Sequence, residues 1–349
     1  MQDGRGLIQP SEYSSLDGET SVAGVDLGDL GVAGTVRAGL AAVERALESE
    51  LAHDDPLLSE VAMHLIRAGG KRFRPLFTLL AAQLGPNPED PLVVVSATVV
   101  ELVHLATLYH DDVMDGAHVR RGALSANARW DNRIAVFGGD YLFARASRLG
   151  ARLGPDGVTT MANAFGELVD GQARETAGAA PDSDPIGHYL RVVHEKTGSL
   201  IATAARYGGL YSGASAGDTE RLYRLGAAVG TAFQIADDII DITSAASESG
   251  KTPGTDLREG VRTLPVLYAL SADSPERDRL RELLVGPVES EGDVLEALAL
   301  LSDSAGLAMA RQRLAEYADS ARAQLIELPD CPANTALRRL VDYTVERAA

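Results

Sequence analysis

Hydrophobic residues recur near every 3.6 positions along most of the chain from about residue 35, a spacing that predicts amphipathic helices. Strand-like alternation is scarce, and no repeat of fixed length stands out. We expect helical runs at 35–51, 57–68, 91–112, 139–153, 157–178, 184–212, 217–243, 261–271, 275–285, 291–327 and 333–348. The pattern therefore predicts one all-α domain at 35–349. Residues 1–34, rich in Gly, Ser and Asp, are expected to form a disordered tail.

The run at 91–112 is apolar almost all round, which favours burial inside a helical bundle. Asp90 and Pro91 have the chemistry of an N-cap and a first-turn proline, so the helix is expected to begin there. Other runs contain internal glycines, which either permit close helix approach, make room for a ligand or are background composition. These glycines are Gly166, Gly171, Gly198, Gly226 and Gly230.

Three carboxylates, Asp111, Asp112 and Asp115, end the apolar run. Residues four apart share a helix face, so Asp111 and Asp115 point the same way with Asp112 beside them. Oxygen ligands of this kind suit Mg²⁺, which usually completes its shell with water and substrate phosphates. Arg120 and Arg121 follow and have the chemistry of diphosphate ligands. The alternative is a solvated helix end with a neutralising basic pair.

A second acidic cluster, Asp237, Asp238 and Asp241, repeats the same DDxxD spacing at the end of another apolar helical run. If the two helices face one another across a bundle, their carboxylates form the rim of a cavity. A diphosphate held there through several Mg²⁺ ions is the interpretation that explains both clusters. Two unrelated solvated faces are the alternative.

Basic and polar residues outside these clusters provide further anion-binding candidates. Lys71 and Arg74 lie in the GGKRFRP segment, which lacks the spacing of a Walker loop. His104 lies two helical turns before Asp111, where it either donates to a diphosphate or is an ordinary core histidine. Lys196 with Thr197, and Lys251 in a later loop, are candidates for a cationic lid, or are simply solvated.

Composition narrows the function classes. The net charge of -18 argues against general nucleic-acid binding, while 45% hydrophobic residues are enough for a sizeable core. The single cysteine, Cys331, excludes an internal disulfide framework and a multi-cysteine metal site. We find neither a signal-peptide pattern nor an uninterrupted apolar run long enough to span a membrane, and therefore expect a cytoplasmic protein with no integral membrane segment.

Taken in order, the segments GGKRFRP, ELVHLATLYHDDVMDGAHVRRG, KTG, FQIADDIID and GKTPGTDLREG closely resemble the motifs of the trans-isoprenyl diphosphate synthases, the polyprenyl synthetase family. The similarity runs from about residue 35 to the end. It implies a single-domain, all-α bundle of the isoprenoid-synthase type around a deep central cavity, and a homodimer. The implied reaction is head-to-tail (1'-4) condensation of an allylic diphosphate with isopentenyl diphosphate.

The resemblance also implies roles for individual residues. Asp111, Asp115 and Asp237 would bind Mg²⁺, about three ions per site, with Asp112, Asp238 and Asp241 supporting. The allylic diphosphate would be contacted by Arg120, Lys196, Thr197, Gln234 and Lys251. The isopentenyl diphosphate would be held by Lys71, Arg74, His104 and Arg121. Catalysis would rest on Asp111, Asp112, Asp115, Arg120, Lys196, Asp237 and Asp238, by stabilising charge on the leaving diphosphate.

One position departs from the family pattern. Many members carry a lysine where this chain has Val261. Either Arg262 replaces that lysine from the next position, or the contact is missing.

Product length is expected to depend on the helix that carries Asp111. In short-chain members, bulky aromatic residues four or five positions before the first aspartate block the tunnel, whereas this chain has Ala106 and Thr107 there and Val103 a turn below. Because interiors are close-packed, these small side chains predict a long all-trans product, about C40–C50. Geranylgeranyl diphosphate synthase is the alternative. The primer, the destination of the product and the dimer interface are left open.

Two other classes are weighed. A class I terpene cyclase also uses an aspartate-rich helix, but the second DDxxD cluster and the GGKRFRP segment argue against it. A non-catalytic subunit of a heteromeric synthase is the non-enzyme alternative, and such subunits tend to lose one of the clusters that are intact here.

Overall fold

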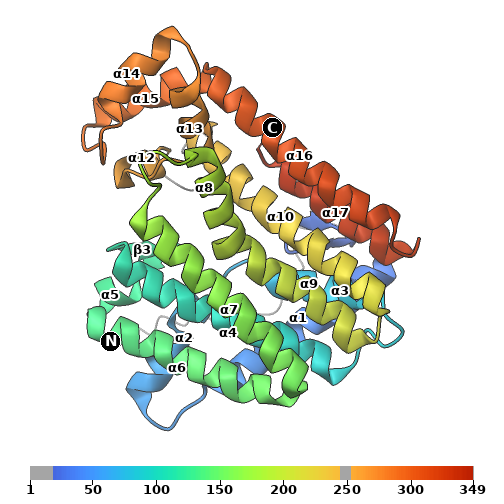
Figure 1. The fold of residues 1–349 in the computed structure, drawn as a ribbon. Coiled ribbons are helices and arrows are strands. Elements are labelled where there is room, and N and C mark those ends of the chain that lie inside the picture. Colours follow the sequence, from blue (N-terminus) through green and yellow to red (C-terminus); the bar gives the residue numbers. More distant parts are fainter. Residues whose placement is uncertain (1–18, 244–252, 349) are drawn as a thin grey trace. The chain divides into compact units, whose positions relative to one another are not determined.

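The computed structural model describes residues 19–243 and 253–348 and is almost entirely helical (Figure 1), which confirms the all-α prediction. In the first half of the chain, the elements are β1 (Ser21–Val22), β2 (Val25–Asp26), α1 (Leu30–Leu51), α2 (Pro56–Arg67), α3 (Phe73–Ala82), α4 (Pro91–Met114), β3 (Val119–Arg120), β4 (Ala123–Leu124), α5 (Ala126–Arg129), α6 (Asn132–Gly150), the 3₁₀ turn η2 (Ala151–Leu153) and α7 (Gly154–Ala177). They are followed by α8 (Pro185–Val193), the π-helical turn η3 (His194–Gly198), α9 (Ser199–Ser212), α10 (Ala216–Thr243), α12 (Thr255–Glu259), α13 (Leu264–Ser271), α14 (Pro275–Leu283), α15 (Glu291–Ser302), α16 (Ala305–Ile326) and α17 (Pro332–Glu346).

The chain divides into two compact units. Of the residues described, the first unit contains 19–165, 200–223 and 325–340, and the second contains 166–199, 224–324 and 341–348, apart from 244–252. The expected single domain at 35–349, with a deep central cavity, stays a prediction.

The N-terminal boundary corrects part of the expected tail. Residues 21–26 form the antiparallel hairpin β1–β2, and Val22, Val25 and Leu27 are buried. Helix α1 begins at Leu30 because the Asp29 carboxylate accepts a hydrogen bond from the backbone amide of Val32 at 2.8 Å. Ordered structure therefore begins before residue 35, and residues 1–18 of the expected tail lie outside the described residues.

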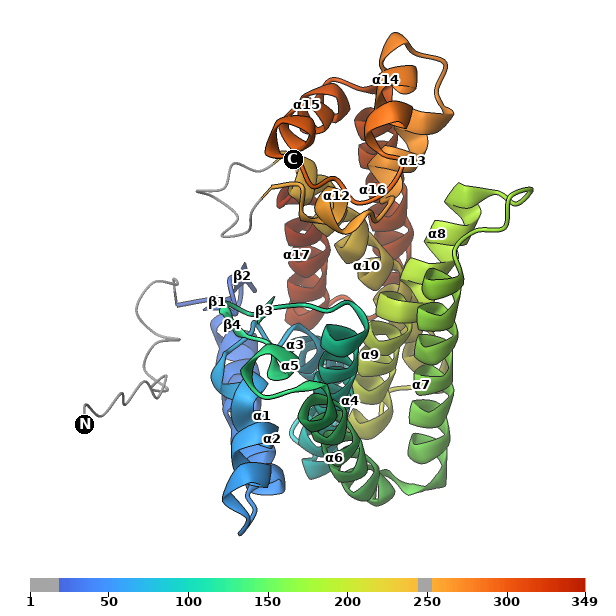
Figure 2. The same ribbon diagram turned by 90° about the vertical axis from the view of Figure 1, so that its left-hand side faces the viewer.

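Helix α4 is the central element of the first unit. Its N-terminus follows the prediction, because the Asp90 side chain accepts from the amide of Leu92 at 2.8 Å and Pro91 occupies the first turn. It packs against α1, α3 and α6, and both ribbon views show α6 running beside it (Figure 2). The approach of α6 is close because a Cβ added at Gly138 would meet Val61 at 2.7 Å and the Tyr109 ring at 3.0 Å.

The same helix corrects the expectation about apolar runs. By length and composition, α4 is long and apolar enough to cross a membrane. However, 78% of its apolar window is buried inside the structure, as expected for the core helix of a bundle.

In the second unit, α10 supplies the main apolar face. Ile235 and Ile239 of α10 are fully buried and join a cluster with Leu264 of α13 and Leu314 of α16. A second cluster, formed with Ile242 at the end of α10, brings together α13, α14 and α15, which Figure 2 shows grouped. The aspartates near the end of α10 are therefore anchored between two apolar clusters.

Two glycines of α7 that the sequence singled out differ in their surroundings. A Cβ at Gly171 would lie 2.8 Å from the Cβ of Glu195 and 2.9 Å from the backbone nitrogen of Lys196, whereas a Cβ at Gly166 would meet nothing within 4 Å. Close approach of η3 to α7 thus depends on Gly171, and Gly166 lies beside open space.

This difference predicts opposite effects of the same substitution. Gly171→Ala should lower the free energy of unfolding by about 1–3 kcal/mol, because backbone atoms of η3 must move. Gly166→Ala should raise it by about 0.5–1 kcal/mol through helix propensity. Denaturant unfolding of both variants provides the measurement, and equal effects would contradict the assignment.

Candidate active site

The three aspartates at the end of α4 are not equivalent. Asp111 is half-buried and Asp115, the C-cap of α4, is exposed, whereas Asp112 is fully buried. Arg120 of β3 donates to Asp112 Oδ1 through Nε at 2.7 Å, and its Nη2 lies 2.7 Å from the same atom. Asp112 Oδ2 is buried and has no hydrogen-bond partner within residues 19–243 and 253–348. Burial raises the pKa of Asp112, and the charge of Arg120 opposes that shift.

The hairpin β3–β4 fixes this arrangement. Its strands pair antiparallel, with Arg120 opposite Ala123, and Gly122 and Arg121 adopt positive φ at the turn. The Asn127 side chain donates to the backbone oxygen of Asp112 at 3.1 Å. The structure therefore brings together Asp112 and Arg120, two residues that the sequence placed in the site without pairing them.

A buried ion cluster around Glu101 lies on the same helix and was missed by the sequence interpretation. Glu101 is 1% exposed, and its Oε1 accepts from Arg72 Nη1 at 3.2 Å and lies 3.8 Å from Arg121 Nη2. Arg72 also donates to both carboxylate oxygens of Glu44 and to the backbone oxygen of Ile66. The sequence did contain a signal for this cluster, namely a charged residue, Glu101, inside an otherwise apolar helix. A charged side chain is rarely buried without partners, so cations were to be expected around it.

The GGKRFRP segment is shaped by backbone conformation. Gly69 and Gly70 have φ of 88° and 136°, and Arg72 adopts a left-handed conformation with φ of 49°. Arg121 donates to the backbone oxygens of Leu65 at 3.1 Å and Gly69 at 2.6 Å. A Cβ at Gly70 would lie 2.9 Å from the Arg121 guanidinium, so glycine leaves the space that Arg121 occupies.

Arg74 and Lys71 complete the basic part of the first unit. The Nε of Arg74 is buried, and no described residue accepts a hydrogen bond from it. Burial lowers the pKa of Arg74 to about 10, opposed by Glu101, so the side chain stays charged at neutral pH. Lys71 is exposed at the turn before α3.

His104 is neutral at pH 7. Burial holds its pKa well below its usual range, and neighbouring arginines lower it further. Those arginines are Arg74, Arg121, Arg72 and Arg120. Four cations around a neutral imidazole make this part of the first unit suited to an anion.

The residues assigned to product length lie on α4 as expected. Val103, Ala106 and Thr107 are 1%, 2% and 8% exposed, and the Thr107 hydroxyl donates to the backbone oxygen of His104 at 2.8 Å. Their role as the floor of a tunnel stays a prediction.

In the second unit, a chain of hydrogen bonds runs from η3 to α8 through α10. Thr197 Oγ1 donates to Gln234 Oε1 at 3.3 Å, and Gln234 Nε2 donates to Asp238 Oδ1 at 3.0 Å. The Tyr189 hydroxyl of α8 donates to Asp238 Oδ2. Burial raises the pKa of Asp238 to about 7, against the effect of these donors. Tyr189 is a further residue of this group that the sequence interpretation did not name.

Lys196 lies in the π-helical turn η3, a distortion often found at functional sites. Its ammonium pairs with Glu175 of α7, while the neighbouring Glu195 accepts from Arg174 at 2.9 Å. The turn therefore contains both predicted residues, Lys196 and Thr197. They lie in the same unit as Gln234 and Asp238.

The other two aspartates of α10 have different partners. Asp237 pairs with Arg347 at the end of α17. Asp241 accepts from the backbone amides of Thr255 and Asp256, each at 3.1 Å, and so caps the start of α12. The charge of Asp237 is therefore balanced by a side-chain cation.

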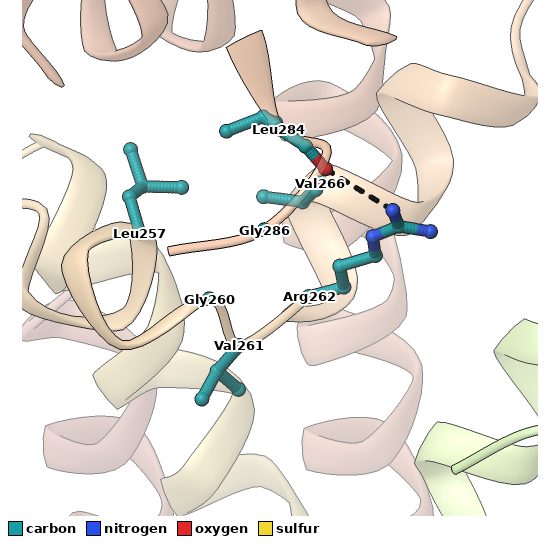
Figure 3. A pocket seen from close by; sticks show the side chains of 7 residues that line it. All are labelled: Leu257, Gly260, Val261, Arg262, Val266, Leu284 and Gly286. Atoms are coloured by element: carbon teal, nitrogen blue, oxygen red, sulfur yellow. Dashed lines mark hydrogen bonds between the residues drawn. The ribbon is translucent and has the colours of Figure 1, made fainter. Parts of the chain in front are cut away.

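The contacts of Arg262 lie at the end of α14, and whether it replaces the lysine of the family pattern stays open. Arg262 Nη2 donates to the backbone oxygen of Leu284 at 3.1 Å, at the C-terminal end of α14 (Figure 3). Val261 is 43% exposed beside it. Both border a small pocket lined mainly by apolar residues and glycines, so Arg262 has a capping contact rather than an evident place among the site residues. Lys251 lies outside the described residues.

The carboxylates fit a hard divalent cation by their chemistry. In the part of the chain that the structure describes, no three His, Cys, Asp or Glu side chains are arranged to hold a metal ion. However, Asp112 has a buried oxygen without a partner, next to the half-buried Asp111 and the exposed Asp115. Carboxylate oxygens of this kind are the ligands that Mg²⁺ takes alongside water and phosphate.

Comparison with known proteins gives concordant matches. The family model "Polyprenyl synthetase" matches residues 55–301. A nonaprenyl diphosphate synthase of Mycobacterium tuberculosis is 59% identical over 94% of this chain and 98% of its own length, and a dimethylallyltranstransferase of the same organism is 45% identical over 93% and 98%. A crystal structure of geranylgeranyl pyrophosphate synthase from Corynebacterium glutamicum, complexed with calcium and isoprenyl diphosphate, superposes with a TM-score of 0.84 at 50% identity, covering 92% of this chain and 99% of that one.

The neutrality of His104 predicts a pH effect on stability. Above its ordinary pKa of 6.5 the imidazole is neutral in both states and contributes nothing. Below that value His104 binds a proton in the unfolded chain but not in the folded protein. The free energy of unfolding therefore decreases as the pH is lowered, by up to about 1.4 kcal/mol per pH unit.

His104→Gln should therefore reduce the loss of melting temperature between pH 7 and pH 5, as measured by calorimetry. His53→Gln, at an exposed position, is the matched control for loss of a histidine. An unchanged acid sensitivity in His104→Gln would contradict the assignment.

Proposed function

The chain belongs to the polyprenyl synthetase family, and we propose that it is a divalent-metal-dependent prenyltransferase that extends an allylic diphosphate with isopentenyl diphosphate. The reaction releases inorganic diphosphate and yields a long-chain all-trans polyprenyl diphosphate. The observation that carries the proposal is the set of arginines around neutral His104, on the helix that ends in Asp111, Asp112 and Asp115. These cations provide a diphosphate site beside the carboxylates of a metal site.

Isopentenyl diphosphate is held in this proposal by Lys71, Arg74, His104 and Arg121. Arg74 has a buried donor without a partner, and a diphosphate oxygen would satisfy it. Neutral His104 donates one N–H without adding charge to a crowded set of cations. Glu101 acts through Arg72 and Arg121, whose guanidinium groups it orients.

Asp111, Asp115 and Asp237 would hold the metal, with Asp112, Asp238 and Asp241 supporting. When bound, Mg²⁺, about three ions in this proposal, supplies charge neutralisation for the leaving diphosphate. Arg120, Lys196, Thr197, Gln234 and Lys251 contact the same diphosphate. The hydrogen-bonded chain from Thr197 to Asp238 supports this assignment, because it fixes the amide of Gln234 from both ends.

The chemistry requires no protein nucleophile. Breaking the allylic C–O bond puts negative charge on the departing diphosphate, where fixed cations stabilise it. The double bond of isopentenyl diphosphate then attacks the allylic cation, and positioning by the residues above supplies much of the remaining acceleration. The proton lost from the new prenyl chain passes to the departing diphosphate.

The product is about C40–C50, because small side chains at 103, 106 and 107 leave room along α4. The nonaprenyl diphosphate synthase is more similar to this chain than the dimethylallyltranstransferase or the C. glutamicum synthase. Geranylgeranyl diphosphate synthesis is the second candidate, supported by that C. glutamicum structure. The protein acts in this proposal as a cytoplasmic homodimer without nucleic-acid partners.

Incubation of the purified protein alone with Mg²⁺, farnesyl diphosphate and labelled isopentenyl diphosphate tests the function. Elongated all-trans products are expected, and chelation of the metal should abolish them. Absence of elongation would favour a non-catalytic subunit, and a cyclic hydrocarbon would favour a terpene cyclase.

Chain length is tested by enlarging Ala106 through Val and Leu to Phe. The main product should shorten stepwise, to several C5 units fewer in Ala106→Phe, because the larger side chain fills the path of the growing prenyl chain. Leu295→Phe, at an exposed position of α15, should leave product length unchanged. A melting curve for each variant separates misfolding from shortening, and an unaltered product in folded Ala106→Phe contradicts the floor assignment.

A further inference from the structure

Arg347, close to the C-terminus, is bound to a residue that the proposed function gives to the metal. Its guanidinium pairs with Asp237 Oδ1, and the two side chains are 20% and 26% exposed. The guanidinium carbon also lies 4.3 Å from the centre of the Phe233 ring. Phe233 and Asp237 are one helical turn apart, so ring and carboxylate hold the arginine from one face of α10.

The Arg347 guanidinium thus occupies the carboxylate that the proposed function gives to a metal ion. Arginine is charged at any physiological pH, and a carboxylate oxygen paired with it is not open to a metal ion. The neighbouring aspartates have other partners. Asp238 accepts from Tyr189 and Gln234, and Asp241 accepts from the amides of Thr255 and Asp256.

We propose that Arg347 is a positioning residue that holds the Asp237 carboxylate oriented in the metal-free protein and is displaced when metal and diphosphate bind. The inference rests on the proposed function and adds to it a competition within the chain. Because Arg347 follows α17 directly, displacement loosens the segment 341–348 that carries it.

The polar environment of Arg347 supports such a displacement. Its Nη1 is buried and has no hydrogen-bond partner among the residues that the structure describes, so the guanidinium is incompletely satisfied by them. A divalent ion carries twice the charge of the guanidinium, and a bound diphosphate supplies additional oxygen ligands to that ion. Separating Arg347 from Asp237 therefore costs little free energy once a metal ion binds the carboxylate.

The test measures metal binding rather than turnover. Uptake of Mg²⁺ in the presence of inorganic diphosphate is titrated calorimetrically for the wild type, Arg347→Gln and Arg338→Gln. Arg347→Gln should bind about two- to fivefold more tightly, the range of one partly exposed ion pair. Arg338→Gln removes the same charge from an exposed position of α17 and should bind like the wild type.

A double-mutant cycle with Asp237→Asn isolates the pair. In that background Arg347→Gln should change Mg²⁺ affinity by less than in the wild type, because the carboxylate for which Arg347 and the metal compete is gone. Hydrogen exchange of 341–348 gives an independent readout. The wild-type segment should lose protection when Mg²⁺ and diphosphate are added, whereas Arg347→Gln should lack protection beforehand. Should Arg347→Gln misfold, the exchange of the wild-type protein and the weaker pair in Arg347→Lys provide the same comparison.

The possible results separate the two proposals. Equal or weaker Mg²⁺ binding by folded Arg347→Gln, or increased wild-type protection on metal addition, would overturn the displacement while leaving the proposed function intact. No uptake of Mg²⁺ with diphosphate by the wild type would overturn the metal-dependent function and this inference with it.

Discussion

Charge buried inside apolar helices is the constraint on which the candidate site depends. Helix α4 is apolar along most of its length, yet it carries Glu101 and Asp112 at positions with almost no exposure to solvent. Each needs a cation, because an unpaired buried charge costs several kcal/mol, roughly 3–5 when one partner of a pair is removed. Arg72 and Arg121 serve Glu101, and Arg120 serves Asp112. The basic residues around the proposed diphosphate site therefore also stabilise the fold of this unit, because they compensate its buried carboxylates.

The second unit meets the same constraint with different partners. Burial raises the pKa of Asp238 to about 7, and the side chains that donate to it are a tyrosine and a glutamine rather than a cation. Asp241 is satisfied by backbone amides, and Asp237 by Arg347. Three carboxylates with one sequence spacing thus have three kinds of partner. The partner of Asp237 is a side chain with a charge that a metal ion can replace, which is why that pair carries a prediction about binding.

Much of the fold was predictable because the helices follow from local hydrophobic periodicity and from capping residues. The apolar run at 91–112, with Asp90 and Pro91 before it, predicted α4 and its capped start, and the run at 217–243 predicted α10. The turn η3 was predicted only as part of a continuous helix, since a π-helical turn leaves no mark on hydrophobic period. Likewise, α1 begins before residue 35 because Asp29 caps it, although Gly and Ser around it suggested a tail.

The sequence by itself determined the candidate site residues: the two aspartate clusters, the basic segment around Lys71 and Arg74, and the small residues before Asp111. These follow from residue type and spacing along a single helix, which are local properties. Only the tertiary structure decided their partners, such as Glu101 with Arg72, Tyr189 with Asp238, and Arg347 with Asp237 across 110 positions of sequence. Long-range pairing depends on how helices pack, and no periodicity within one helix encodes it.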